Sequence, residues 1–297
     1  QTVAKLKDNA TYPWVNVPVS RPMQIRDLLT MTSGLTYGGL YHPAEKATSD
    51  GNDRLMKETE EKFTTRQFAD MLGGLPLLFE PGSHWNYSYS MDVVGALIEV
   101  WSGMSFGEYV KETIFKPLGM EHTCFAPACT EEENLCVYWD YNPEQKTYKK
   151  FEGNGFPLYW GKTMESGGAG LISTLGDYDK FARMLCNRGT AENGVKILGR
   201  KTVELMQKNH LNEQQQKDLD WGQLVGYGYG LGVRTMTDPV TGGSSSVGEF
   251  GWSGLTGTYV LVDPEEELTI VYMQQMSPNM EHDIHPRLRN IIYGCIE

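Results

Sequence analysis

Two tyrosines stand close together in a polar segment, HWNYSYSMDVVG, at residues 84–95. Tyr87 and Tyr89 come just before an apolar stretch with helical spacing and lie outside its apolar face. A phenol has an ordinary pKa of about 10, so it is a poor base at neutral pH. It becomes useful only where nearby positive charge favours the phenolate. The pair therefore predicts either proton-transfer chemistry or a tyrosine-bearing helix cap.

A glycine-rich stretch later in the chain could hold a developing negative charge. Residues 248–264 read GEFGWSGLTGTYVLVDP, with four glycines within ten residues at the start of an expected strand. Glycine in a strand lets another backbone or a ligand come close. A strand edge can also offer a backbone N–H to an oxyanion. The alternative is a bulged edge strand without a chemical role.

Several common catalytic motifs are absent from the sequence. Residues 251–255 read Gly-Trp-Ser-Gly-Leu and miss the Gly-x-Ser-x-Gly elbow at its last position. No His-Glu-x-x-His helix, phosphate loop or dinucleotide fingerprint occurs. His122 lies near Cys124, Cys129 and Cys136, but the cysteine spacings do not match a usual zinc site. The five cysteines are expected to be small buried thiols in a reducing compartment, and no metal or organic cofactor is implied.

The hydrophobic pattern predicts an α+β protein. Apolar residues recur at helical spacing through most of the chain. The expected helices cover residues 23–31, 64–72, 90–103, 105–115, 176–189 and 201–210, with a loop at 212–218. After about residue 226 come β-branched and aromatic runs separated by turns, then a helix over 285–296. We expect a mostly helical region over 1–225 and an antiparallel sheet with one helix over 226–297, interleaved in one domain.

The overall composition narrows the function classes. The 297 residues carry a net charge of −12, which argues against nucleic acid and anionic membrane surfaces as partners. No apolar run approaches the ~20 residues that a membrane-spanning helix needs. The chain opens at Gln1 and shows no signal peptide, so the compartment, cytoplasmic or exported, is left open. A small-molecule substrate is consistent with this composition.

Five segments occur in an order that is typical of one protein family. They are RPMQIRDLLTMTSGL (21–35), FEPGSHWNYS (79–88), DVVGALIEVWSGMSFGEYVKETIFKPLGMEHTCF (92–125), SGGAGLISTLGDYDKFARML (166–185) and FGWSGLTGTYVLVDPEEEL (250–268). Together they resemble the serine β-lactamase and penicillin-binding family, in particular its class C and family VIII esterase branch. The resemblance implies a β-lactamase-like fold, in which helices flank an antiparallel sheet, and a serine hydrolase that forms an acyl-enzyme.

The resemblance implies catalytic roles for Tyr87 and Leu255. Tyr87 falls on the family's motif tyrosine, the general base or proton relay for a serine nucleophile. The Leu255 N–H falls where the family has an oxyanion donor. The family's serine and lysine belong to a Ser-x-x-Lys turn, which this sequence lacks; residues 2–5 have a similar spacing but no apolar helix after them. We therefore expect the N-terminal strands and the nucleophile helix to lie outside this chain, which would leave the remaining sheet with an open edge. Either a second polypeptide carries the missing part, or another copy of this chain covers the gap.

Four further positions are expected to contact substrate. Tyr89 falls where the family motif has Asn, and Trp252, Ser253 and Gly254 fall on its Lys-Thr-Gly. A tryptophan cannot supply the cation that a lysine offers to a β-lactam carboxylate. Both departures resemble the esterase branch, and an aromatic pocket rim suits uncharged acyl groups. The implied substrates are carboxylic esters or small amides.

Other functions share these residues. A D-amino-acid peptidase or a weak β-lactamase would use the same catalytic groups on another substrate. A member that had lost its nucleophile could instead bind peptidoglycan fragments or a partner protein, and the lack of Ser-x-x-Lys fits that alternative. A Ser-x-x-Lys encoded upstream of Gln1 would favour the enzyme.

Overall fold

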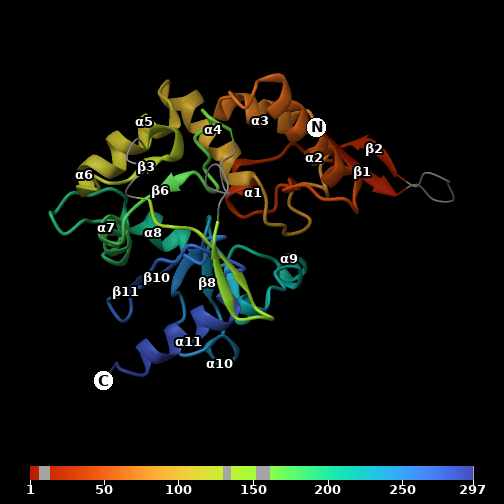
Figure 1. The fold of residues 1–297 in the computed structure, drawn as a ribbon. Coiled ribbons are helices and arrows are strands. Elements are labelled where there is room, and N and C mark those ends of the chain that lie inside the picture. Colours follow the sequence, from red (N-terminus) through yellow and green to blue (C-terminus); the bar gives the residue numbers. More distant parts are fainter. Residues whose placement is uncertain (7–13, 130–134, 152–160, 297) are drawn as a thin grey trace.

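The computed structural model describes residues 1–6, 14–129, 135–151 and 161–296. Figure 1 shows the helices of the first half of the chain gathered on one side and the sheet of its last third on the other. Helices dominate the first part, and the main sheet with its helix comes last. The expected α+β class is confirmed.

The main sheet has five antiparallel strands in the order β11-β10-β9-β8-β7. The strands are β7 (Tyr227–Tyr229), β8 (Arg234–Met236), β9 (Phe250–Ser253), β10 (Tyr259–Asp263) and β11 (Leu268–Tyr272). A tight turn over residues 264–267, within the sequence VDPEEE, joins β10 to β11. Among the described residues, no strand pairs with the other edge of β11.

Helices cover both faces of this sheet. Leu261 on β10 packs with residues of α11 (Glu281–Tyr293) on one face. Its neighbour Val262 points to the other face and packs with residues of α7 (Leu175–Cys186). Successive side chains in a strand point to opposite faces, so β10 buries an apolar residue on each side.

Most of the expected helices are present, with shifted ends. They are α1 (Ile25–Leu29), α3 (Thr65–Gly73), α4 (Ser90–Ser102), α5 (Phe106–Val110), α7 and α8 (Arg200–Met206). The helix expected over 105–115 continues past its predicted end. The chain continues from α5 through a π-helical turn, η1 (Lys111–Phe115), into α6 (Lys116–Leu118), and ends at Gly119 with φ of 67°. Pro117 lies in the first turn of α6, directly after the π-helical turn.

Two helices were not expected from the hydrophobic pattern. The fully buried residues of the helix α2 (Pro43–Glu58) are the small Ala44, Thr48 and Gly51, and its larger apolar residues that pack on the core, Leu55 and Met56, lie only in the last turns, so most of the helix has no apolar stripe to detect. Its start does carry a signal, because His42 caps the first turn and Glu45 accepts from the backbone of His42. The expected loop at 212–218 is instead α9 (Glu213–Asp218), capped by Asn212.

Short strands tie the two parts of the chain together. The strand β12 (Met276–Ser277), from the C-terminal part, pairs with β4 (Trp139–Asn142), which pairs in turn with β5 (Thr147–Lys150). The other small sheets join β1 (Thr2–Leu6) to β2 (Trp14–Pro18), and β3 (Cys124–Phe125) to β6 (Leu171–Ile172). The remaining short helices are η2 (Ala126–Ala128), η4 (Gly222–Leu224) and α10 (Pro239–Gly242).

The cysteines do not behave as small buried thiols. Cys124 and Cys129 form a disulfide with Cα atoms 5.8 Å apart. Cys136 and Cys295 are exposed, and Cys186 is half-buried. The expectation of five buried thiols is therefore wrong, because two neighbouring positions come close enough to bond. Within the described ranges, no group of three or more His, Cys, Asp or Glu side chains could hold a metal ion.

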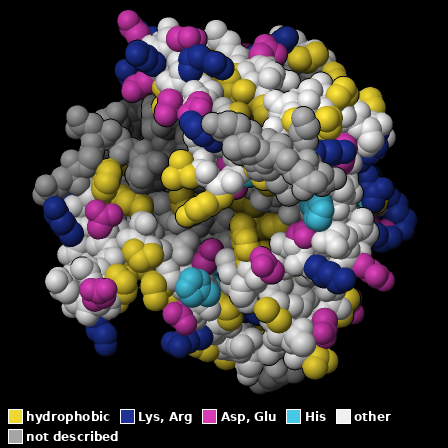
Figure 2. Space-filling model, turned by 90° about the vertical axis from the view of Figure 1, so that its right-hand side faces the viewer, with side chains coloured by type: hydrophobic (Ala, Val, Ile, Leu, Met, Phe, Trp, Pro, Cys, Tyr) yellow, Lys and Arg dark blue, Asp and Glu magenta, His cyan; other side chains and the backbone are white. Residues whose placement is uncertain are grey.

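The surface is mixed in charge. On the face drawn in Figure 2, acidic and basic side chains are interspersed, and hydrophobic side chains gather around a hollow near the centre. Phosphate-binding surfaces instead cluster Lys and Arg. In the part of the chain that the structure describes, no helix has the length and apolar character to cross a bilayer.

Candidate active site

Tyr87 lies in a cluster of aromatic rings between the helical region and the main sheet. The Trp252 Nε1–H, from β9, donates to Tyr87 Oη at 3.0 Å. The two rings stack with centroids 5.1 Å apart, and Trp221 meets Tyr87 edge-on at 5.4 Å. Six residues form this aromatic cluster: Tyr37, Trp85, Tyr87, Trp221, Tyr229 and Trp252. The structure thus brings together two candidate residues that are 165 positions apart.

The electrostatic surroundings of Tyr87 keep its phenol protonated. Burial raises the pKa of Tyr87, and hydrogen bonding with Trp252 and Tyr37 opposes that rise. The charged groups that act on it are two carboxylates, Asp92 and Glu281, which raise the pKa further. A phenol becomes a base only when positive charge favours the phenolate. The charges that act on the Tyr87 phenol are thus negative, and they disfavour the phenolate.

Asp92 is a buried carboxylate that sequence reasoning missed. It lies in the first turn of α4, where the Ser166 hydroxyl donates to it at 2.6 Å and the Gly168 N–H at 3.4 Å. Burial raises the pKa of Asp92 to about 6, against these hydrogen bonds. Its charge also raises the pKa values of Tyr37 and Tyr87. The signal in the sequence that could have identified Asp92 is an acidic residue within an apolar helical stretch.

Leu255 lies in the turn that joins β9 to β10. The turn is closed by the Gly254 N–H, which donates to Thr258 O at 2.8 Å, and by the Gly257 N–H, which donates to Gly254 O at 2.9 Å. In the described part of the chain, the Leu255 N–H donates to no protein acceptor. The Leu255 side chain is 71% exposed. The amide is therefore available to an external acceptor, which an oxyanion donor requires.

Tyr89 lies in the core of the helical region, where its ring meets Tyr37 of the aromatic cluster edge-on at 4.5 Å. It is 2% exposed and packs edge-on against Phe68 with ring centroids 4.9 Å apart. Its hydroxyl oxygen accepts from Asn52 Nδ2, on α2, at 3.2 Å. These contacts give Tyr89 a packing role, and its contact with substrate stays a prediction.

Ser253 and Trp252 leave β9 on opposite faces of the sheet, because side chains alternate along a strand. Trp252 joins the aromatic cluster, whereas Ser253 lines a small pocket with Arg234 and Tyr259 on the α11 side. Gly254 follows β9 directly and begins the turn that carries Leu255. The expected substrate contacts of Ser253 and Gly254 stay predictions.

A larger cavity lies between α1 and α8. Its volume is about 410 Å³, and its wall includes Leu29, Leu205 and Leu231 with Arg26 and His210. This volume is within the range of small-molecule pockets. The leucines make the cavity wall apolar, with two nitrogen-bearing side chains as its polar groups.

The comparison with protein families identifies the fold of this chain. The family model named Beta-lactamase matches residues 5–293. The chain belongs to the beta-lactamase family. The β-lactamase-like fold implied by the sequence resemblance is therefore confirmed, and Tyr87, Trp252 and Leu255 all lie within the matched range.

Two curated relatives and one solved structure illustrate the similarity of this beta-lactamase family member to known proteins. Protein Rv1367c from Mycobacterium tuberculosis is 29% identical over 277 residues, 90% of this chain and 65% of that protein. A protein from Escherichia coli named "Putative D-alanyl-D-alanine carboxypeptidase" is 28% identical over 246 residues, 72% of this chain and 52% of that protein. The solved structure of EstCE1, a hydrolase with promiscuous acyltransferase activity, has a TM-score of 0.75 at 24% identity, covering 93% of this chain and 73% of that one. The chain thus spans less than two thirds of the length of these two curated relatives.

Proposed function

We propose that this chain forms part of a serine hydrolase that acts through an acyl-enzyme on carboxylic esters or small amides. In this proposal Tyr87 is the general base or proton relay, and the Leu255 N–H is an oxyanion donor. Trp252, Ser253 and Gly254 shape the substrate pocket. The observation that carries the proposal is the 3.0 Å hydrogen bond from Trp252 Nε1 to Tyr87 Oη, which joins the two motif positions across the molecule.

The surroundings of Tyr87 favour an uncharged substrate. Its neighbours are aromatic rings, and the charges that act on it are carboxylates. A substrate carboxylate would meet repulsion there and would find no lysine at position 252. An ester or amide whose acyl group is apolar avoids both costs and can pack on the rings.

The nucleophile in this proposal comes from a Ser-x-x-Lys segment on a second polypeptide. The 297-residue chain itself contains no Ser-x-x-Lys. A lysine on that segment would lower the pKa of Tyr87 by placing a cation beside it, and the serine would supply the attacking oxygen. The serine and the lysine would thus both be supplied by one helical turn of that segment.

Two other functions remain as alternatives within this proposal. The Escherichia coli relative supports a peptidase that acts on D-amino-acid peptides, although Trp252 is a poor partner for the free carboxylate of such a peptide. The lack of Ser-x-x-Lys supports a non-catalytic binding protein. A D-alanyl-D-alanine peptide offered beside an ester distinguishes these alternatives.

The first experiment is a denaturing intact-mass spectrum of the purified protein after exposure to p-nitrophenyl butyrate. An acyl adduct on a polypeptide that carries Ser-x-x-Lys, together with release of p-nitrophenol, is the expected result. An adduct on a serine of this chain would overturn the assignment of the nucleophile. Unmodified protein and no nitrophenol release would favour the binding-protein alternative.

The second experiment tests the role of Tyr87 in the complete protein. Tyr87→Phe removes the hydroxyl and is expected to lower kcat/KM by about 10²-fold or more, the usual contribution of a general base. Tyr148→Phe is the matched control, because Tyr148 is exposed on β5. Equal activity of the two variants would contradict the proposed role.

A further inference from the structure

Tyr37 and Asp92 face one small space beside Gly168. A Cβ at Gly168 would stand 2.9 Å from Asp92 Oδ2 and 3.4 Å from Tyr37 Oη. Glycine keeps this space open, because any other residue would place its side chain there. Gly168 is half-buried and the next residue, Ala169, is exposed, so the space lies close to solvent. A phenol and a carboxylate thus meet at one polar space that the backbone leaves unfilled.

Tyr37 lies between this space and Tyr87. The rings of Tyr37 and Tyr87 are tilted, with centroids 5.6 Å apart, and hydrogen bonding with Tyr37 lowers the pKa of Tyr87. The Trp252 Nε1–H donates to the same Tyr87 oxygen at 3.0 Å. A phenol can accept one hydrogen bond and donate another at the same time. Tyr87 and Tyr37 can therefore form a continuous hydrogen-bonded chain that leads to the space beside Gly168.

Asp92 is the carboxylate at the end of this chain. It is 2% exposed, and its Oδ1 accepts from the Ser166 hydroxyl at 2.6 Å, whereas Oδ2 faces the open space. Burial raises the pKa of Asp92 to about 6. A group with a pKa near the working pH takes up and releases a proton readily. The charge of Asp92 also raises the pKa values of three phenols, Tyr37, Tyr87 and Tyr89.

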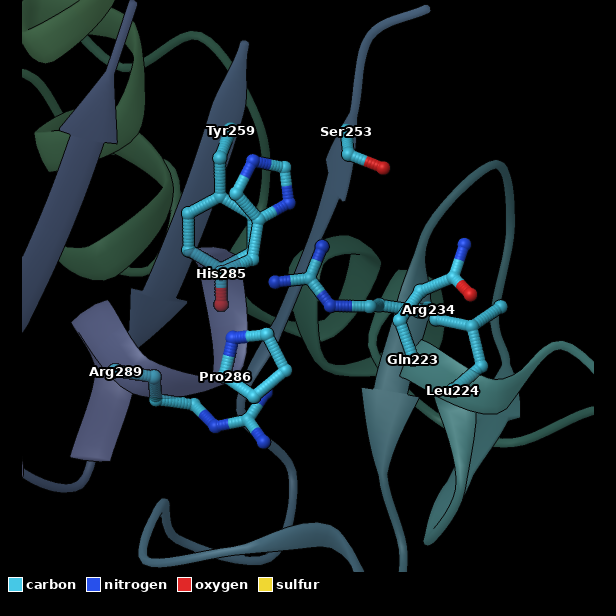
Figure 3. A pocket seen from close by; sticks show the side chains of 8 residues that line it. All are labelled: Gln223, Leu224, Arg234, Ser253, Tyr259, His285, Pro286 and Arg289. Atoms are coloured by element: carbon cyan, nitrogen blue, oxygen red, sulfur yellow. The ribbon is translucent and has the colours of Figure 1, made fainter. Parts of the chain in front are cut away.

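Two buried cations near this site lie on the other face of the sheet. Figure 3 shows the side chains of Arg234 and Arg289 beside the small pocket that Ser253 lines. Trp252, which contacts Tyr87, leaves β9 on the opposite face. The charges that act on Tyr87 are carboxylates, and they disfavour its phenolate. Tyr87 therefore takes up a proton most readily when it passes its own proton on.

Of the two carboxylates that act on Tyr87, Asp92 is the one that shares a space with Tyr37. Glu281 instead accepts from Gln223 Nε2 at 3.0 Å and is 3.9 Å from His285 Nδ1. The contacts of Glu281 thus connect it to the start of α11, whereas Asp92 lies at the end of the phenol chain.

We propose that Asp92 is the final proton acceptor of a relay that runs from Tyr87 through Tyr37 and one water molecule beside Gly168. The inference rests on the proposed hydrolase function, because the proton that enters the relay is that of the serine nucleophile. It adds to that function a destination for the proton that Tyr87 receives.

The proton transfers balance along the relay. As the serine oxygen bonds to the acyl carbon, its proton moves to Tyr87 Oη. The Tyr87 proton moves to Tyr37 Oη, the Tyr37 proton to the water, and a water proton to Asp92 Oδ2. At each phenol and at the water one O–H bond forms as another breaks, so no phenolate accumulates. The Asp92 carboxylate becomes neutral while the acyl carbonyl oxygen becomes the oxyanion, and the proton returns by the same path to the leaving group.

The first test is the pH profile of p-nitrophenyl butyrate hydrolysis by the complete protein. Wild-type kcat/KM is expected to rise as the pH passes through about 6, where Asp92 becomes a carboxylate. Asp92→Asn cannot take up the proton, and Gly168→Ala fills the space of the water. Both variants should lose this rise and lower kcat about tenfold or more, with KM unchanged, because neither residue touches the substrate.

Gly176→Ala is the matched control, because a Cβ at Gly176 would meet no atom within 4 Å. Its pH profile should equal that of the wild type. A wild-type rise in a folded Asp92→Asn protein would overturn the assignment of Asp92. The same rise in folded Gly168→Ala would overturn the water path.

The second test needs no turnover. Infrared difference spectra of the purified protein below and above pH 6 should contain the C=O band of protonated Asp92, assigned by its loss in Asp92→Asn. Tyr37→Phe and Gly168→Ala should shift this band, because each breaks the chain that reaches the carboxyl group, and the exposed Tyr148→Phe should not. A band that neither variant moves would overturn the relay. A band that shifts in a protein without ester hydrolysis would contradict the proposed function and leave the hydrogen-bonded chain in place.

Discussion

Trp252 and Ser253 are adjacent on β9, yet their side chains enter two very different environments. On the Trp252 side the neighbours are rings, with Tyr87 stacked at 5.1 Å and Tyr229 edge-on at 5.3 Å. On the Ser253 side lie Arg234, Arg289 and the fully buried Glu249 beneath it. A single strand thus separates an aromatic surface from a buried network of charges.

The difference indicates that the two faces of the sheet have different roles. The aromatic side has no buried ion pair among the described residues, and its buried carboxylate, Asp92, is held by hydrogen bonds from Ser166 and Gly168. The ionic side joins β7, β8, β9 and α11 through Tyr227, Arg234, Glu249 and Arg289. Removing one member of a buried ionic network leaves its partners uncompensated. The ionic side is therefore expected to hold the sheet in place, and the aromatic side to set what binds.

The largest effect is expected from Glu249→Ala. Glu249 is fully buried and accepts from Tyr227 and Ser245 as well as Arg234. The substitution leaves Arg234 as an unpaired buried cation, so the free energy of unfolding should fall by about 3–5 kcal/mol. Urea denaturation measures this change. Glu204→Ala is the control, since Glu204 pairs with Arg200 and Lys201 at the surface; a similar loss in both variants would refute the division between the two sides.

An intermediate, pH-dependent effect is expected from Asp92, the buried carboxylate on the aromatic side. Its pKa in the folded chain is about 6, against an ordinary value of 3.8, so the native state binds a proton more readily than the unfolded state. Stability from this group is therefore present below pH 4 and is lost as the pH rises through 6. The difference between these two pKa values corresponds to about 3 kcal/mol of unfolding free energy.

Asp92→Asn isolates this contribution. Between pH 4 and pH 7 the unfolding free energy of the wild type should fall as Asp92 loses its proton, and that of the variant should not. The difference in unfolding free energy between the two proteins should therefore change sign or shrink toward low pH. Denaturant titrations at several pH values measure it. A constant difference across this range would mean that Asp92 does not titrate with a raised pKa. The asparagine keeps an acceptor for the Ser166 hydroxyl, which limits other losses.

The sequence resemblance identified the two residues that meet at the site, and local patterns could not have done so. Tyr87 and Trp252 are 165 positions apart, and nothing in either stretch indicates the other. The same resemblance put Tyr89 at the motif position of Asn, with an expected contact to substrate that stays a prediction. Side chains two positions apart share a face only in a strand. Tyr89 instead caps α4 with φ of −65° and ψ of 16°, which turns it into the core.

Hydrophobic periodicity found helices with apolar stripes and missed those without them. The fully buried residues of α2 are Ala44, Thr48 and Gly51, whose small side chains carry little signal. The ionic network was also invisible, because its members lie on separate elements. Arg289 and Tyr227 are 62 positions apart, and only the folded sheet and α11 bring them together. Buried charges are rare enough that sequence reasoning treats an Arg or Glu as a surface residue.

The smallest effect is expected from Trp252→Phe, which keeps a ring but removes the indole donor to Tyr87. One lost hydrogen bond to a neutral hydroxyl should lower the free energy of unfolding by about 1 kcal/mol. The pKa of Tyr87 should rise further, because the Trp252 hydrogen bond lowers it. A double-mutant cycle with Tyr87→Phe isolates the bond, since Trp252→Phe should cost less when the acceptor is already absent. If Trp252→Phe costs the same in both backgrounds, the contact contributes only packing, and the aromatic side is held by its rings alone.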